Sequence, residues 1–422
     1  MIRNTKTLSG ARVSTAVAFG LQGFLLAVLL TQLPQFKDDL GFSDSLVAAT
    51  VVGISIVAGV GSVLAEQLAK ATSSRTTLRT GLFVIAVGAA VIALATSTPA
   101  FLAAFALYGI GLGIVDAAAN MQAVSIQHAY GRVILSSFHA SWSVGAIIGA
   151  GYVAACSALD LSVELSFLVA AAAVAALCAG IGPRLLRTGH ERAATSVTAP
   201  LTVPLRPFLA LGVAMMLFYA IDFGIGTYSP LYLKEVLLSD AGTAALAMGA
   251  YQVTALISRL TGDHWVRRFG EIAVVRVGAA ISVAGLLIAV LAPSPVVAIA
   301  GFFIVGLGAP VIAPLSFSAA GRLAPPDQTD AVIARINLFN YAGTVIAGGV
   351  IGGIAALSDL RIGFVAPLLF AVVLFLLAPA FAPTRHVPGT PRASPLPPAR
   401  DRGRPGKWCT YRDGPDVREV RL

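Results

Sequence analysis

Charged side chains are scarce in this chain of 422 residues. Only 12% of the residues are Asp, Glu, Lys or Arg, whereas 57% are hydrophobic. A soluble domain has about a quarter charged residues, and so few polar groups could not cover its surface. This scarcity excludes a soluble enzyme, and it excludes a nucleic-acid-binding module although the formal net charge is +9. We expect an integral membrane protein whose surroundings are the lipid bilayer.

Cysteine is also rare, and common catalytic signatures are missing. Three scattered cysteines, Cys156, Cys178 and Cys409, exclude a disulfide framework and a clustered metal site. No glycine-rich loop ends in Lys-Ser or Lys-Thr, so ATP does not power a process on this chain. A His-Glu-x-x-His helix and a Gly-x-Ser-x-Gly turn are both missing, so a hydrolase has no visible machinery. We therefore expect no enzyme, no metal and no cofactor.

What the sequence has instead is long apolar runs. A membrane-spanning helix needs about 20 mostly apolar residues, whereas a barrel strand needs only about 10 and alternates in polarity. The length of the unbroken runs favours helices. We predict an all-α integral membrane protein with twelve transmembrane helices, at residues 11–33, 45–68, 80–97, 100–124, 134–158, 163–183, 207–229, 243–264, 272–292, 296–320, 331–357 and 361–381.

Basic residues flank these runs unevenly. One side holds the amino terminus, the connections after the even-numbered runs and the tail, and it has nearly all of the Lys and Arg. Around the eighth and ninth runs we assign four arginines to this side: Arg259, Arg267, Arg268 and Arg276. The opposite side has only Lys37, Lys234 and Arg361. Because cytoplasmic loops are enriched in Lys and Arg, we predict that both termini are cytoplasmic.

The longest internal connection, about Pro183 to Pro207, divides the runs into two sets of six. We predict an N-terminal bundle at residues 1–183, a cytoplasmic loop at 184–206, a C-terminal bundle at 207–382 and a disordered, basic cytoplasmic tail at 383–422. Six helices per half give both halves the same orientation, as a parallel repeat requires. A shift of 197 residues aligns the glycines at 109 and 111 with those at 306 and 308, and aligns Glu66 with Asp263. This pattern indicates a weak internal repeat.

Two parallel six-helix halves joined by a basic connection resemble the major facilitator superfamily of secondary transporters. In that superfamily the loop after the second helix typically reads Gly-x-Leu-Ala-Asp-Arg-x-Gly-Arg. The first copy here, Ser62-Val-Leu-Ala-Glu66-Gln67, replaces the glycine and has Glu as its acid. The second copy, Gly262-Asp263 followed by Arg267-Arg268-Phe269-Gly270, is closer to the pattern. The resemblance implies a central cavity lined by helices one, four, seven and ten.

Three segments are similar to the fucose-permease-like branch of this superfamily. They are Pro34-Gln-Phe-Lys37 after the first helix, Gly109-Ile-Gly-Leu-Gly-Ile-Val-Asp-Ala-Ala-Ala-Asn120 in the fourth, and Ser136-Ser-Phe-His-Ala-Ser-Trp-Ser-Val-Gly145 in the fifth. One position departs from the pattern, because Leu30 stands where fucose permease has an acid. The resemblance therefore implies a transporter but not fucose as its substrate.

Three ionisable side chains are expected deep inside the membrane: Asp116, His139 and Asp222. A charge at the membrane centre costs about 2.5–3.5 kcal/mol on insertion scales, so such residues are candidates for function. Asp116 lies on a small, polar helical stripe with Asn120, and the shift of 197 residues places Ala313 at its counterpart. We predict all three as proton-coupling residues, with the two aspartates facing each other across the cavity. The alternative for Asp116 and His139 is a hydrogen bond between packed helices.

Two further groups of residues are candidates for function. The substrate-cavity candidates are polar or aromatic side chains within the spans, and interhelix packing is their alternative role: Gln22, Asn120, Trp142, Ser143, Tyr219, Asn337 and Asn340. The cytoplasmic-gate candidates are charges at helix ends: Glu66 with Arg75 or Arg79, and Asp263 with Arg267 or Arg268. The alternative for these charges is an anchoring role that fixes helix depth.

From these observations we predict a secondary active transporter of the cell membrane. It is expected to be a monomer that moves a small organic solute together with protons by alternating access of its two halves. No Lys or Arg is predicted inside the cavity, which disfavours multiply anionic solutes and leaves neutral or cationic ones, including sugar-like solutes. One alternative is an efflux antiporter of drugs or metabolites on the same fold. The other is a non-transporting membrane sensor or scaffold.

Overall fold

The computed structural model describes residues 5–186 and 202–382, and within these ranges the chain is helical, with no strand. The expected tail at 383–422 and most of the expected central loop lie outside the described residues. In the N-terminal half the helices are α1 (Thr5–Leu40), α2 (Asp44–Ala71), α3 (Ser74–Ala93), α4 (Thr98–Tyr130), α5 (Leu135–Ala158) and α6 (Val163–Ile181). Ser43, Ser73 and Ser162 cap α2, α3 and α6, because each side chain accepts the amide hydrogen of the residue three positions later.

The C-terminal half begins with α7 (Leu205–Glu235), α8 (Ala241–Phe269) and α9 (Glu271–Val290). Each of the remaining three crossings is interrupted. Helix α10 (Pro295–Gly308) continues into α11 (Ile312–Leu323) through a 3-10 turn at Ala309–Val311, where Pro310 has no amide hydrogen to donate. Helix α12 (Thr329–Ile346) continues through a π-helical turn at Ala347–Ile351 into α13 (Gly352–Leu357). Short α14 (Leu360–Gly363) precedes α15 (Val365–Leu377).

The described residues contain 11 helical segments that are long and apolar enough to cross a membrane. The remaining predicted span corresponds to α8, whose 29 residues carry five of the chain's ionisable side chains near its second half: Arg259, Asp263, His264, Arg267 and Arg268. Its length still matches a crossing, because 29 residues at 1.5 Å each extend about 44 Å, and the bilayer core is about 30 Å thick. The prediction of twelve helices in two repeats is confirmed, with α8 as the one polar member.

The repeated glycines hold equivalent helix pairs together in the two halves. In the first half, a Cβ on Gly111 of α4 would lie 2.8 Å from the backbone nitrogen of Ile85 in α3. In the second half, a Cβ on Gly308 of α10 would lie 2.2 Å from the carbonyl oxygen of Gly278 in α9. No side chain fits at either contact, so glycine permits the close approach of backbones that small residues give to membrane helices.

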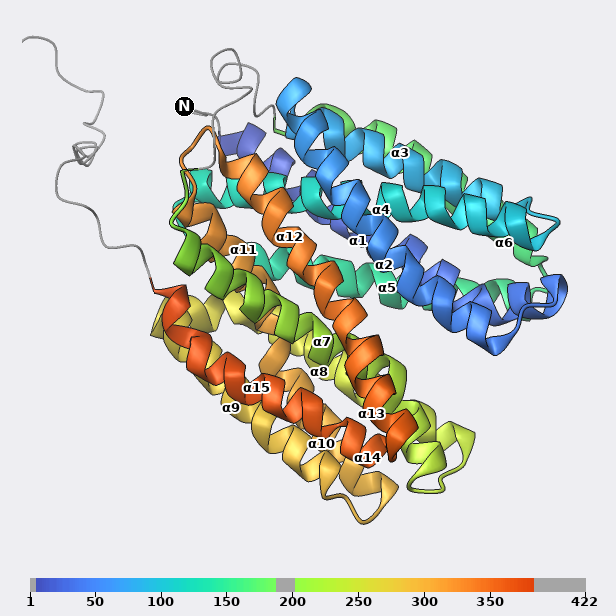
Figure 1. The fold of residues 1–422 in the computed structure, drawn as a ribbon. Coiled ribbons are helices and arrows are strands. Elements are labelled where there is room, and N and C mark those ends of the chain that lie inside the picture. The colour runs from blue at the N-terminus through green and yellow to red at the C-terminus, as the bar shows by residue number, and fades with distance from the viewer. Residues whose placement is uncertain (1–4, 187–201, 383–422) are drawn as a thin grey trace, which may run out of the picture. The chain divides into compact units, whose positions relative to one another are not determined.

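The two halves lie side by side in Figure 1 and converge at one end of the helices. This end carries the start of α1, the connection from α2 to α3, and the start of α7; we call it the basic end, because the Lys and Arg of the connections gather there. Toward the opposite end the helices of the two halves diverge in the same view (Figure 1). Residues at mid-length of the helices therefore lie between a joined end and a separated one.

Candidate functional site

Asp116 lies near the middle of α4, with 18 helical residues before it and 14 after it. Its side chain faces the other half: Oδ2 accepts hydrogen bonds from Nδ2 of Asn340, at 2.9 Å, and from the hydroxyl of Tyr341, at 3.0 Å. Gln22 of α1 and Asn337 of α12 lie near enough to act electrostatically on the carboxylate. Asp116 is nevertheless the one residue between Gly111 and Val124 that is only partly buried. A membrane-embedded carboxylate thus bridges the two halves and keeps an accessible face.

Asp222 lies at the equivalent depth of α7, with 17 helical residues before it and 13 after it. Its Oδ1 accepts a hydrogen bond of 2.5 Å from the hydroxyl of Tyr251 on α8. Nη2 of Arg259, also on α8, lies 3.9 Å from the same oxygen. The side chain of Asp222 is 25% exposed. The two aspartates therefore have separate sets of partners, Asp116 on α12 and Asp222 on α8.

Arg259 corrects the sequence analysis in one respect. The sequence analysis assigned it to the basic side, but it lies in the body of α8, ten residues and about 15 Å before Phe269. It is only 6% exposed, and its Nη1 donates a hydrogen bond of 2.7 Å to the hydroxyl of Ser143 on α5, in the other half. The assumption that no arginine lies inside the bundle was therefore wrong. Arg259 lies five residues inside the eighth apolar run, which indicates a position within the bundle. We assigned it to the basic side because most other Lys and Arg lie there.

The remaining cavity candidates lie around these groups. Tyr219 is one turn from Asp222, is partly exposed and is within electrostatic range of both aspartates and of Arg259. The ring of Trp142, also partly exposed, lies under the guanidinium of Arg259 at 5.9 Å. Asn337, by contrast, is fully buried, and its Nδ2 lies 3.4 Å from the hydroxyl of Ser62 on α2.

His139 does not contact either aspartate side chain among the described residues. Its Nε2 lies 3.3 Å from Oδ1 of Asn120, and Nδ2 of Asn120 donates to the backbone carbonyl of Asp116, at 2.9 Å. The imidazole ring is packed between Phe19 of α1 and Phe317 of α11, at centroid distances of 5.3 and 6.0 Å. This surrounding resembles the alternative that the sequence analysis left open, a histidine bonded to a neighbouring helix.

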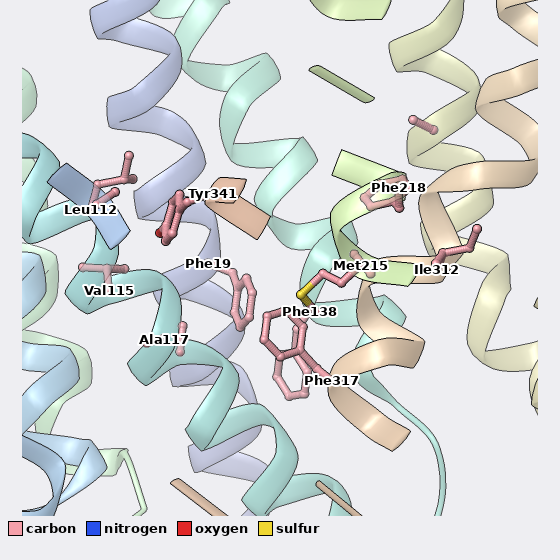
Figure 2. Packing of buried hydrophobic residues seen from close by; sticks show 14 of the residues in the cluster. Phe19, Leu112, Val115, Ala117, Phe138, Met215, Phe218, Ile312, Phe317 and Tyr341 are labelled. Atoms are coloured by element: carbon pink, nitrogen blue, oxygen red, sulfur yellow. The ribbon is translucent and has the colours of Figure 1, made fainter. Parts of the chain in front are cut away.

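Aromatic rings from both halves close the bundle between these polar groups and the basic end. Figure 2 shows Phe19, Phe138 and Phe317 side by side, and the first two rings are stacked at 5.9 Å. All three are buried, and they come from α1, α5 and α11. Met215 of α7 lies against the same group in Figure 2. This layer is apolar and buried, and it is built by helices of both halves.

Several polar contacts join the halves at the basic end, among them Gln127 to Ser318 and Ser62 to the carbonyl of Ala334. The two gate acids take part in this contact, each with a first partner that the sequence did not indicate. Glu66 of α2 was paired with Arg75 or Arg79, but its carboxylate binds Arg335 of α12, with bonds of 2.9 and 3.0 Å, and Lys70 one turn along. Arg79 instead lies against Gly182. The sequence could not identify Arg335 as the partner, because it is 269 residues away from Glu66 along the chain.

The second gate acid, Asp263, binds backbone amides before any cationic side chain. Both carboxylate oxygens of Asp263 on α8 accept backbone amide hydrogens in the first turn of α5, from Ser136 and Ser137, each at 3.0 Å. Arg267 extends this contact, since its Nη1 donates to the carbonyl of Val133. The guanidinium of Arg268 lies over the ring of its neighbour Phe269. Asp263 thus binds the positive end of a helix from the other half.

Together these contacts describe a bundle that is joined at the basic end and carries accessible acids at mid-depth. The described residues contain no group of three or more His, Cys, Asp or Glu side chains placed to hold a metal ion. The groups at this site that can bind a polar or charged solute are Asp116, Asp222, Arg259 and their hydroxyl and amide neighbours.

Known proteins match this chain along most of its length. The family model of the Major Facilitator Superfamily matches twice, over residues 15–237 and 208–408. An uncharacterized MFS-type transporter of Yersinia pestis is 31% identical over 361 residues, which cover 84% of this chain and 91% of that protein. An uncharacterized transporter of Sinorhizobium fredii is 29% identical over 86% of this chain and 96% of its own length.

Solved structures show the same fold at lower identity. FucP, a fucose:proton symporter of E. coli, matches in its outward conformation with a TM-score of 0.72 and 20% identity, over 88% of this chain and 98% of that chain. The human organic anion transporter MFSD10 matches with a TM-score of 0.72 and 17% identity, over 88% of this chain and 99% of that chain. The two matches agree with the arrangement of helices described above.

Proposed function

Because the chain belongs to the Major Facilitator Superfamily, we propose that it is a proton-coupled secondary transporter of a small organic solute, working by alternating access of its two halves. The observation that carries this proposal is Asp116, an accessible carboxyl at mid-membrane depth whose hydrogen-bond donors lie on the other half. A change in the relative position of the halves alters these bonds. Proton binding at Asp116 and rearrangement of the halves are thereby linked.

The physical basis of this link is the charge of the carboxylate. An ionised carboxylate resists transfer into a dry, apolar environment, whereas a protonated one does not. Asn340 and Tyr341 stabilise the ionised form while the bundle is joined at the basic end. Protonation removes the charge and weakens these bonds, which favours release of α12 from α4. A ligand shifts a conformational equilibrium only by binding the two states differently, and the proton at Asp116 meets this condition.

The test is transport by proteoliposomes that contain the Asp116→Asn variant. Asparagine imitates the protonated side chain, so we expect exchange of solute at equal pH to continue. Uphill accumulation driven by a proton gradient should be lost. Asp160→Asn, at an exposed position after α5, is the matched control and should accumulate solute normally. Accumulation by Asp116→Asn under a proton gradient alone would contradict the assignment. The direction of flux in the same assay separates import from export.

The orientation is part of the proposal. The Lys and Arg of the basic end support a location of that end, and of both termini, on the cytoplasmic side of the cell membrane. The same structure then represents the state closed toward the cytoplasm, with Asp116 and Asp222 facing outward. A cysteine introduced at Arg75, in a variant lacking the native cysteines, should resist impermeant thiol reagents in intact cells. Labelling of this cysteine by an external reagent would show that the orientation is the opposite one.

A further inference from the structure

Arg259 is a buried charged side chain that the coupling scheme above does not use. It lies about 15 Å from the end of α8, at a depth where a guanidinium is costly to place. Residues of this kind persist in membrane helices when they bind a partner of opposite charge. At the shift of 197 residues its counterpart in the first half is Ser62, so the repeat does not explain it.

The neighbours of Arg259 leave much of its hydrogen-bonding capacity unused. A guanidinium has five N–H donors. Nη1 donates to Ser143, but Nη2 is 3.9 Å from the Asp222 carboxylate, beyond hydrogen-bonding distance. Nε is buried and has no hydrogen-bond partner among the described residues. The Asp222 oxygen that faces Arg259 already accepts the 2.5 Å hydrogen bond from Tyr251. Arg259 therefore has a counter-ion, Asp222, that is too distant to accept a hydrogen bond, and its buried Nε–H has no acceptor among the described residues.

The missing partner is best matched by a carboxylate. Two oxygens of a carboxylate can accept two parallel N–H bonds from one guanidinium, which a hydroxyl or a single carbonyl cannot do. The surroundings favour a single negative charge, because Asp222 and Asp116 would repel a second one. Asp222, Tyr219 and Trp142 are partly exposed, so a solute can reach this position. The two aromatic rings offer apolar surface next to the charge.

We propose that Arg259 is the anchor for the carboxylate of a small organic monocarboxylate, and that this carboxylate replaces Asp222 as the counter-ion of Arg259. The apolar part of the solute lies against Trp142 and Tyr219. Ser143 brings α5 of the other half to the same guanidinium, so the bound solute contacts both halves. This inference rests on the proposed transport function and specifies its substrate class.

The test is equilibrium binding to the purified full-length protein, without any proton gradient. The probes are benzoate and its neutral isostere benzamide, and the readouts are the melting temperature and the dissociation constant. Benzoate should raise the melting temperature of the wild type, and benzamide should not. In Arg259→Gln this selective effect should vanish, whereas Arg268→Gln, which changes an arginine near the end of α8, should keep it. Asp222→Asn removes the competing carboxylate, so it should tighten benzoate binding about tenfold.

Arg259→Lys guards against misfolding, since it keeps the charge but cannot form the two-point contact. It should fold and bind benzoate more weakly than the wild type. Equal effects of benzoate and benzamide, no stabilisation by benzoate, or unchanged benzoate binding in Arg259→Gln would each overturn the inference. A purely structural Arg259 would lower the melting temperature in Arg259→Gln without any carboxylate selectivity in the wild type. If the wild type and Arg259→Gln transport neutral solutes equally well, the inference is refuted and the proposed function still stands.

Discussion

The two halves share a frame but differ in their chemistry. Gly111 and Gly308, aligned by the 197-residue shift, sit at equivalent close contacts between α3 and α4 and between α9 and α10. The ionisable residues at mid-depth have no such counterparts. Asp222 and Arg259 align with Leu25 and Ser62 of the first half. Helix packing must be satisfied in both halves alike, whereas a binding group is needed only once.

The connections at the basic end differ in the same way. Glu66 and Asp263 align, yet Glu66 binds the guanidinium of Arg335, and Asp263 binds two backbone amides of α5. The two acids are similarly buried, Glu66 at 9% and Asp263 at 6% exposed, but their partners differ: the side chain of Arg335 is 43% exposed, whereas Ser136 is 0% exposed. Water and salt weaken an ion pair whose cation is exposed, and a buried acceptor of buried amides is costly to lose. The sequence repeat therefore conceals two contacts of unequal strength.

The largest expected effect concerns the shared frame. Gly111→Ala and Gly308→Ala each place a methyl group against backbone atoms, and overpacking of this kind costs about 1–3 kcal/mol. We expect both variants to lose folded protein, measured as melting temperature and monodisperse yield. Gly180→Ala and Gly249→Ala are the controls, one in each half, because an added Cβ meets nothing within 4 Å. Tolerance of Ala at only one of the two test positions would break the equivalence of the halves.

A middle-sized effect is expected at Asp263. In Asp263→Asn one acceptor oxygen becomes an amide donor that faces the backbone amides of α5, so the contact at the basic end should weaken. Loss of a buried acceptor costs about 1–3 kcal/mol, or roughly a 5- to 150-fold change in the ratio of open to closed forms at this end. The measurement is thiol labelling of a cysteine introduced at Ser137 on a background without native cysteines. Unchanged labelling would show that Asp263 does not hold this end closed.

The smallest effect is expected at Glu66. Glu66→Gln removes an ion pair whose Arg335 side chain is 43% exposed, which is worth about 0.2–1 kcal/mol, less than roughly a tenfold change. Labelling of a cysteine at Ala334 should therefore rise less than labelling at Ser137 rises in Asp263→Asn. The exchanged pair Glu66→Arg with Arg335→Glu should restore the wild-type pattern. If labelling rises as much in Glu66→Gln as in Asp263→Asn, the two contacts are equally strong and this prediction is wrong.

Much of the fold was predictable because helix formation in a bilayer depends on local sequence. The run predicted at 134–158 became α5 at Leu135–Ala158, since length and apolar composition decide a span without help from its neighbours. The run predicted at 11–33 became α1 at Thr5–Leu40, with Pro34 inside the helix. Polar residues can extend a helix beyond the apolar core, so hydropathy located the crossing but not the ends.

The candidate site was predictable in its residues and not in its contacts. Asp116 and Asp222 stand out because an acid inside an apolar run is unusual at any position. Arg259 was missed because we grouped it with the arginines of the nearest connection when we compared the Lys and Arg content of the two sides. Tyr251 was missed because a tyrosine in a helix gives no sign of what its hydroxyl binds, and here it binds Asp222.

The sequence by itself determined that this is a helical membrane protein with two related halves, where the spans lie, and which acids are embedded. These properties follow from the transfer of side chains and backbone into lipid, which each segment experiences on its own. Only the tertiary structure decided that Asp116 bonds to Asn340 and Tyr341, that Glu66 meets Arg335, and that Arg259 lies between Ser143 and Asp222. Those pairings join residues of different helices, and in most cases of different halves. Their distances depend on how the helices pack and not on the order of residues along the chain.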